Sequence, residues 1–136
     1  MVFKTLVGSS KRVSKAKKYL IKWDNSSRSK MQYNCKQFLK QFWLNDIVFE
    51  EFPIAGTRLS IDFYNSNKKI AVEVQGGQHL KYTPHFHGKS KQTFLSQVRR
   101  DNDKQEFCKI NNIKLVEVYP GDELSAELFS SFGVCL

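Results

Sequence analysis

The chain has 136 residues, of which 40% are hydrophobic and 13% aromatic, and this is enough apolar material for the core of one ordinary domain. Extensive disorder is therefore excluded, and no apolar run approaches the ~18 to 20 residues that a membrane-spanning helix needs. The apolar stretch at the N-terminus is too short for a secretion signal. Three widely spaced cysteines, Cys35, Cys108 and Cys135, indicate buried, reduced thiols rather than a disulfide framework. We expect a soluble, cytoplasmic protein.

The net charge of +9 is concentrated at the N-terminus. Residues 1–40 contain 11 of the 22 Lys and Arg residues and one of the 13 acids, so their net charge is +10 and that of the remaining 96 residues is −1. A basic segment on a nearly neutral body is typical of a protein that binds nucleic acid. The alternatives are a solubilising surface and an anionic membrane surface, which the lack of a strong apolar face disfavours. Nucleic acid is the expected partner.

Two helices are predicted in the N-terminal third. Residues 11–23 follow the capping sequence Gly8-Ser9-Ser10 and place apolar residues at helical spacing. A polar break at residues 24–27 precedes a second amphipathic helix at about residues 29–44. We therefore divide the chain into a basic, DNA-binding helical extension, residues 1–27, and a main domain, residues 28–136.

The period of the hydrophobic pattern then changes from helix to strand. Strands are predicted at residues 47–53, 58–64, 69–75 and 113–119. A long helix is predicted at residues 91–111, and Asp122 is the expected cap of a last helix at residues 123–132. This order predicts an α/β fold around one mixed sheet flanked by helices.

The central hairpin carries the most informative polar residues. Leu59, Ile61 and Phe63 are expected to form one apolar row, and Ile70, Val72 and Val74 the other. Because side chains alternate along a strand, Asp62, Glu73 and Gln75 then share the opposite face. Carboxylates on neighbouring strands lie ~5 to 8 Å apart, where they raise one another's pKa or bind a hard cation such as Mg²⁺. The alternative is a polar face exposed to solvent.

These residues resemble a known superfamily. Asp62, ten intervening residues and Glu73-Val74-Gln75 resemble the metal-binding signature of PD-(D/E)XK nucleases. The segments 53–63, 72–79 and 100–104, with residues 113–118, resemble more closely the branch of very-short-patch-repair (Vsr-like) endonucleases, which includes phage homing endonucleases. The resemblance covers residues 28–120 and implies a restriction-endonuclease-like core.

The resemblance also implies roles for individual residues. Asp62 and Glu73 would be metal ligands, with the Val74 carbonyl as a third. Gln75 stands where the superfamily usually has Lys, so it could orient water but could not supply positive charge. His79 matches the histidine of the branch, a general acid or base; a surface-loop histidine is the alternative.

Accessory positions are less distinctive. Gln32 lies closest to the place of a helical Glu in the branch, with Glu50 and Glu51 as other providers. Asp101 or Asp103 would match a late acid, although either could instead cap or pair on its helix. The expected DNA-binding residues are Lys11, Arg12, Lys15, Lys18, Arg99 and Arg100. His85 and His87 have the spacing of a metal pair, but no cysteine lies near them, so zinc is not expected.

The leading hypothesis is a Mg²⁺-dependent endonuclease that cleaves double-stranded DNA in the manner of a homing endonuclease, with Mn²⁺ as an acceptable substitute. A double-strand cutter of this size should be a homodimer or higher homo-oligomer, and the resemblance points to a phage-encoded protein in a bacterial host. The alternatives are a Holliday-junction resolvase of the same superfamily and a non-catalytic nucleic-acid-binding protein.

Overall fold

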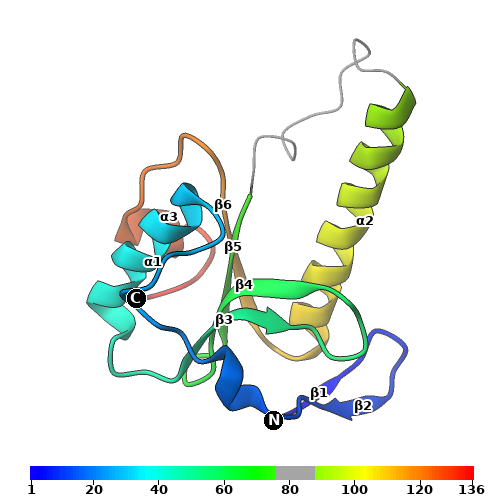
Figure 1. Ribbon diagram of the computed structural model, residues 1–136, viewed down its shortest axis with the longest axis horizontal. Helices are drawn as coiled ribbons and strands as arrows, with labels where there is room; N and C mark the ends of the chain where they lie inside the picture. Colours follow the sequence, from blue (N-terminus) through cyan, green and yellow to red (C-terminus); the bar gives the residue numbers. More distant parts are fainter. Residues whose placement is uncertain (76–87) are drawn as a thin grey trace.

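A mixed four-stranded sheet forms the centre of the fold (Figure 1). The computed structural model describes residues 1–75 and 88–136, without the side chains of residues 88–91, 93 and 94. The strands are β3 (Val48–Pro53), β4 (Ser60–Asn65), β5 (Ile70–Val74) and β6 (Lys114–Val118), in the spatial order β3-β4-β5-β6. The pairs β3–β4 and β4–β5 are antiparallel, whereas β5 and β6 are parallel. The predicted α/β class and all four strands are confirmed.

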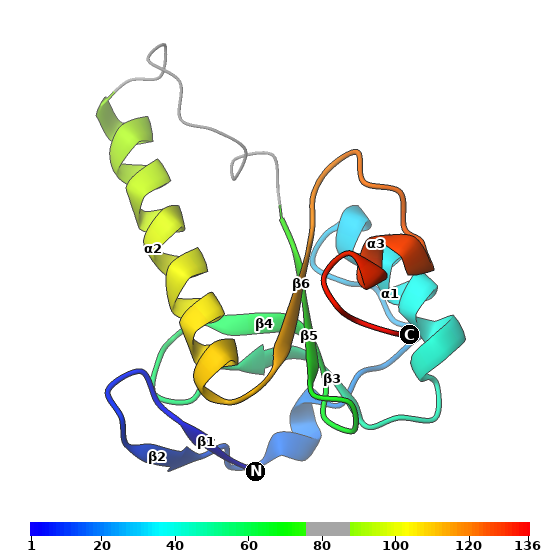
Figure 2. The same cartoon turned by 180° about the vertical axis from the view of Figure 1, so that it is seen from behind.

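Helices cover both faces of this sheet. Helix α1 (Lys30–Trp43) begins after Ser29, whose side chain caps it by accepting from the Gln32 backbone N–H. It packs with the short helix α3 (Ala126–Ser130) on one face, where Leu39 and Trp43 are fully buried. The long helix α2 (Gly88–Ile110) connects β5 to β6 and lies on the other face (Figures 1 and 2). The predicted helices at 29–44 and 91–111 are confirmed.

The N-terminal segment forms a hairpin instead of the helix predicted over residues 11–23. Strands β1 (Val2–Lys4) and β2 (Ser10–Arg12) pair antiparallel, and only a 3₁₀ turn, η1 (Ala16–Tyr19), follows. The helix prediction is wrong because Lys15 adopts a left-handed conformation, with φ of 54°, and Val13 donates its N–H to the Met1 carbonyl instead of to a helical turn. The basic residues Lys11 and Arg12 therefore lie on a strand.

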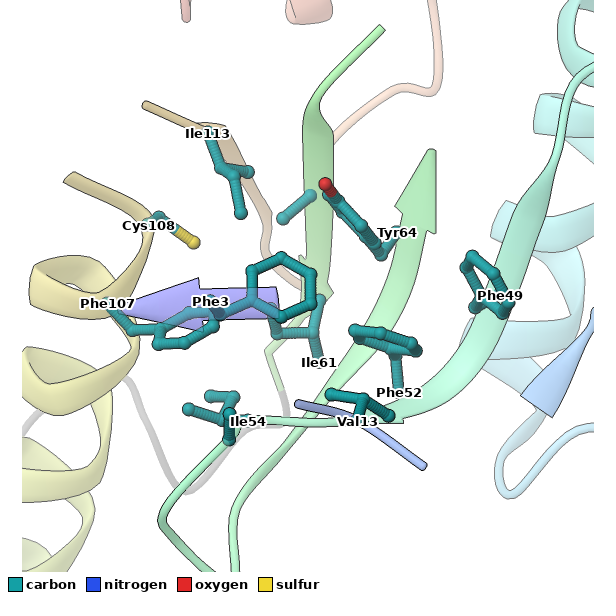
Figure 3. Packing of buried hydrophobic residues seen from close by; sticks show 12 residues of the cluster. Phe3, Val13, Phe49, Phe52, Ile54, Ile61, Tyr64, Phe107, Cys108 and Ile113 are labelled. Atoms are coloured by element: carbon teal, nitrogen blue, oxygen red, sulfur yellow. The ribbon is translucent and has the colours of Figure 1, made fainter. Parts of the chain in front are cut away.

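Aromatic packing attaches this hairpin to the sheet. The Phe3 ring lies 5.8 Å from Phe52, 6.0 Å from Tyr64 and 5.6 Å from Phe107 of α2 (Figure 3). Val13 is buried in the same cluster. Edge and tilted aromatic contacts of this kind add to the free energy gained from area burial, so burial of Phe3 and Val13 outweighs the weak helical pattern of the segment.

The central hairpin departs from a regular pleat. Ile61 packs in the cluster on the α2 face, whereas Phe63 packs on the α1 face, so the predicted apolar row of Leu59, Ile61 and Phe63 is wrong. The neighbouring strand is irregular at the same level, where Glu51 has φ of 54° between the pairs Glu50–Phe63 and Phe52–Ile61. A left-handed residue within a strand increases the local twist. The second row, Ile70, Val72 and Val74, is confirmed on the α1 face.

Two further predictions near the C-terminus need correction. Asp122 is not the cap of the last helix. This helix, α3, begins after Ser125, whose side chain caps it by accepting from the Leu128 N–H, whereas Asp122 accepts from the Tyr119 N–H in a turn. Cys135 is exposed, although its neighbours Val134 and Leu136 pack against the core, whereas Cys35 and Cys108 are buried as predicted.

Candidate functional site

Asp62 and Glu73 lie together where the sheet divides into two halves. The pairing of β4 with β5 ends at Phe63 and Val72, while β4 continues along β3 and β5 continues along β6. The two halves turn away from each other at this point (Figure 2). Asp62 is 2% exposed and Glu73 4%, and Asp62 Oδ2 accepts from the Val74 N–H at 2.8 Å. The expected convergence of the two acids is observed.

The two carboxyl groups share one electrostatic environment. Burial, the charge of Asp62 and a hydrogen bond between the two side chains together raise the pKa of Glu73, against the opposing effect of Lys104. A carboxyl that binds a proton so strongly beside a second carboxyl also favours a bound cation. The pair thus has the electrostatic character of a cation site.

Each acid also contacts a basic side chain that the sequence did not assign to the site. Lys104 Nζ of α2 lies 2.8 Å from Glu73 Oε1, an ion pair whose angles fall outside hydrogen-bond alignment. Arg28, in the segment before α1, places one guanidinium nitrogen 3.3 Å from Asp62 Oδ1 and the other 3.7 Å from Glu51. Lys104 follows the predicted basic pair 99–100 in sequence, but no sequence signal pointed to Arg28.

Gln75 is buried beside this pair and is oriented by β6. Its backbone N–H donates to the Val118 carbonyl at 2.7 Å, and its side-chain Nε2 donates to Glu117 Oε2 at 3.0 Å. Glu117 also accepts from the Tyr119 hydroxyl. The amide nitrogen of Gln75 thus donates to Glu117, and its amide oxygen is an acceptor that can orient a water molecule.

Gln32 organises the acids of the first strand. Its side-chain nitrogen donates to Glu50 at 2.9 Å and to Glu51 at 3.0 Å. The fully buried Lys36 pairs with Glu50 at 2.8 Å. Gln32 thus acts as a hydrogen-bond donor to carboxylates. Glu51 is linked to Asp62 through Arg28, which contacts both side chains.

A hollow of about 700 Å³, here called the central hollow, opens over the two acids. The predicted site residues that line it are Gln32, Asp62, Glu73, Val74, Gln75, Arg100 and Asp101, joined by Arg28, Arg58 and Lys104. Lys18 lines a neighbouring hollow of about 320 Å³, the side hollow, which shares Arg28 with the first. The predicted residues that line neither hollow are Lys11, Arg12, Lys15, Arg99 and Asp103. His79, His85 and His87 lie outside the described residues.

The donors of the central hollow fit a hard divalent cation. Asp62 and Glu73 supply carboxylate oxygens, and Glu73 Oε1 is buried without an aligned hydrogen bond. Oxygen-only donor sets with room for water suit Mg²⁺. Within residues 1–75 and 88–136, no group of three or more His, Cys, Asp or Glu side chains is arranged to bind a metal. The carboxylate pair, with Val74 as the adjacent backbone donor, is therefore the site to consider.

Proteins of three animal viruses are similar to parts of this chain. Uncharacterized protein 307L of Invertebrate iridescent virus 6 is 47% identical over 60 residues, which are 44% of this chain and 30% of that protein. Uncharacterized protein 094L of Frog virus 3 is 39% identical over 66 residues, 48% of this chain and 43% of that protein. Uncharacterized protein 033L of Invertebrate iridescent virus 3 is 30% identical over 95 residues, 66% of this chain and 48% of that protein.

The chain thus covers less than half the length of each of these relatives, and their names state no activity. No family model and no solved structure matches the chain. Among the described residues, no helix combines the length and apolarity required to cross a bilayer. The chain is similar to proteins of invertebrate and frog viruses, and this similarity gives no support to the expected phage source.

Proposed function

We propose that this chain is a Mg²⁺-dependent DNA endonuclease that hydrolyses phosphodiester bonds in double-stranded DNA, in the manner of a homing endonuclease. We further propose that it belongs to the PD-(D/E)XK superfamily, near the very-short-patch-repair branch. The observation that carries the proposal is the buried Asp62–Glu73 pair at the floor of a hollow whose walls carry Arg28, Arg58, Arg100 and Lys104. Acids at the floor suit a cation, and bases on the walls suit a polyanion.

The residues of the central hollow divide the chemistry among them. Asp62, Glu73 and the Val74 carbonyl would hold Mg²⁺, which on binding supplies an acidified water and neutralises charge on a phosphoryl oxygen. Gln75, fixed by Glu117, would direct the attacking water through its amide oxygen. The basic walls would hold the phosphates flanking the scissile bond. His79 remains the proposed general acid or base.

Partners and location follow from the same proposal. One active site would cleave one DNA strand, so cleavage of both strands requires at least a homodimer. The free thiols of Cys35, Cys108 and Cys135 fit a reducing, cytoplasmic environment. The basic N-terminal segment would add phosphate contacts on the flank of the duplex through Lys11, Arg12, Lys15 and Lys18.

The test is digestion of long duplex DNA with Mg²⁺ and with EDTA, followed by end mapping. Wild type should cut only with Mg²⁺, and Asp62→Asn and Glu73→Gln should each reduce cleavage by about 10²- to 10³-fold or more. Glu123→Gln, on an exposed residue outside the central hollow, is the matched control and should cut normally. Either carboxamide variant cutting as fast as wild type would disprove the assignment.

A four-way junction and a linear duplex in the same assay separate the alternatives. Cleavage confined to the junction would make the chain a Holliday-junction resolvase. Retained DNA binding without cleavage of either substrate, under Mg²⁺ or Mn²⁺, would make it a non-catalytic nucleic-acid-binding protein.

A further inference from the structure

Each of the two buried acids is held by its own cation, and the two cations come from opposite walls of the central hollow. Arg28 precedes α1 and contacts Asp62 at 3.3 Å, whereas Lys104 belongs to α2 and contacts Glu73 at 2.8 Å. Both cations line the central hollow together with the acids that they contact. The two positive groups therefore lie beside the carboxylates of Asp62 and Glu73, which a bound divalent cation would neutralise.

Neither cation is fixed in this position. The side chain of Arg28 is 68% exposed, and its second contact, with Glu51, is a longer one of 3.7 Å. Such exposed pairs contribute little free energy and exchange readily. Lys104 is less exposed, at 19%, but its ammonium ends a flexible stem of four carbons that can turn within the hollow. Neutralisation of Glu73 removes the ion pair of Lys104, and neutralisation of Asp62 leaves Arg28 only its longer contact with Glu51.

We propose that Arg28 and Lys104 form a phosphate clamp, which the carboxylates of Asp62 and Glu73 restrain until these acids are neutralised by a bound divalent cation. This inference rests on the proposed function and adds a regulation of the same site. Once released, the guanidinium can bind two phosphate oxygens in parallel and the ammonium a third. Cation binding and DNA binding are then positively coupled, and the coupling acts in both directions.

The neighbouring surface supports DNA as the occupant of the clamp. Arg58 and Arg100 line the same hollow and are exposed. On the other side, Arg28 is shared with the side hollow, whose wall includes Lys18 and Lys22. A phosphate backbone that crosses the acids thus meets positive groups both before and after Arg28, as a continuous polyanion requires.

The proposal is tested by a double-mutant cycle in EDTA, where no cleavage occurs. The probe is a fluorescein-labelled, random-sequence DNA duplex, and its dissociation constant is measured by anisotropy. Asp62→Asn/Glu73→Gln imitates the neutralisation of the acids without a cation and should tighten binding about fivefold or more. In a chain that also carries Arg28→Met/Lys104→Met, the same two carboxamide changes should tighten binding less than twofold.

The control removes two positive charges away from both hollows, with Lys69→Met/Lys109→Met. Both lysines are exposed, in the β4–β5 turn and in the last turn of α2. This control should keep the full gain from the carboxamide changes, which separates release of the clamp from a general change in net charge. Circular dichroism melting of each variant verifies that it is folded.

The result of the double-mutant cycle does not depend on whether the chain is a nuclease. A gain from the carboxamide changes that is equally large in the Arg28→Met/Lys104→Met chain would overturn the clamp, as would no gain in the wild-type background. Mg²⁺-dependent cleavage could still stand in either case. Absence of any DNA binding by the wild-type chain would instead refute the proposed function itself.

Discussion

The buried ion pair between Lys36 and Glu50 provides a stability prediction that can be worked out from the structure. Lys36 is 0% exposed and lies 2.8 Å from Glu50, whose side chain is 14% exposed. Glu50 also accepts from Ser27 at 2.7 Å and from Gln32 at 2.9 Å. This network holds α1 against β3 and fixes Gln32, which also donates to Glu51 at the side hollow.

We expect Lys36→Met to destabilise the protein by about 2 to 4 kcal/mol. Removal of one partner from a buried pair costs about 3 to 5 kcal/mol, because the other charge stays buried without compensation. The lower range applies here because Glu50 retains two hydrogen bonds and some contact with water. For a chain of this length, each kcal/mol lowers Tm by roughly 3 to 6 °C, so urea and thermal unfolding both resolve the change.

Two further variants decide whether burial is the cause. Lys36→Met/Glu50→Gln removes both charges and leaves acceptors for Ser27 and Gln32, so its stability should return to within about 1 kcal/mol of wild type. Lys40→Met breaks the ion pair with Asp24, which is equally short at 2.7 Å but exposed, and should change Tm little. If Lys36→Met unfolds like wild type, or if Lys40→Met costs as much, the reasoning from burial is wrong.

Three other predictions concern the fold. Phe3→Ala should lower the free energy of unfolding by about 3 to 4 kcal/mol while the transition stays single, because the N-terminal hairpin shares the aromatic core of the sheet; a separate early transition in thermal melting would contradict this. Ser29→Ala should cost about 1 kcal/mol in urea unfolding through loss of the α1 cap, whereas no change would mean that the cap is dispensable. A thiol reagent such as DTNB should modify only Cys135 in the native protein and all three cysteines in denaturant, because burial raises the pKa of the Cys35 and Cys108 thiols to about 12; rapid modification of a second thiol would refute their burial.

The sequence predicted those elements whose hydrophobic period was long and undisturbed. The strand and helix pattern from residue 29 to residue 118 was recoverable because most of the elements are bounded by turn residues and carry an apolar pattern of one period. The alternation of β5 was predicted correctly, whereas that of β4 breaks at Asp62, since Ile61 and Phe63 pack on opposite faces. Local patterning was therefore sufficient for the order of the elements, but not for the way in which the two acids meet.

The sequence did not predict what depends on contacts between distant segments. The hairpin of residues 2–12 forms because Phe3 finds an aromatic cluster contributed by β3, β4 and α2, and no local pattern contains that information. The split between Ile61 and Phe63 coincides with the left-handed Glu51 on the adjacent strand. Arg28 reaches Asp62 across 34 residues of sequence, so its place in the central hollow becomes visible only after the fold is known.

The division of the sheet explains how two acids can lie buried in apolar strands and still face a hollow. In a continuous sheet, the N–H of Val74 would be available to a facing β4 carbonyl, and side chains from a covering helix would fill the space. Because β4 leaves β5 after the Phe63–Val72 pair, that N–H instead finds Asp62 Oδ2, which fixes one carboxylate at the fork. The parallel pairing of β5 with β6 continues to Val118 and keeps Glu73 rigid beside it. The α2 crossover that parallel pairing requires then carries Lys104 over the fork, so the connection that closes the sheet also supplies a wall of the central hollow.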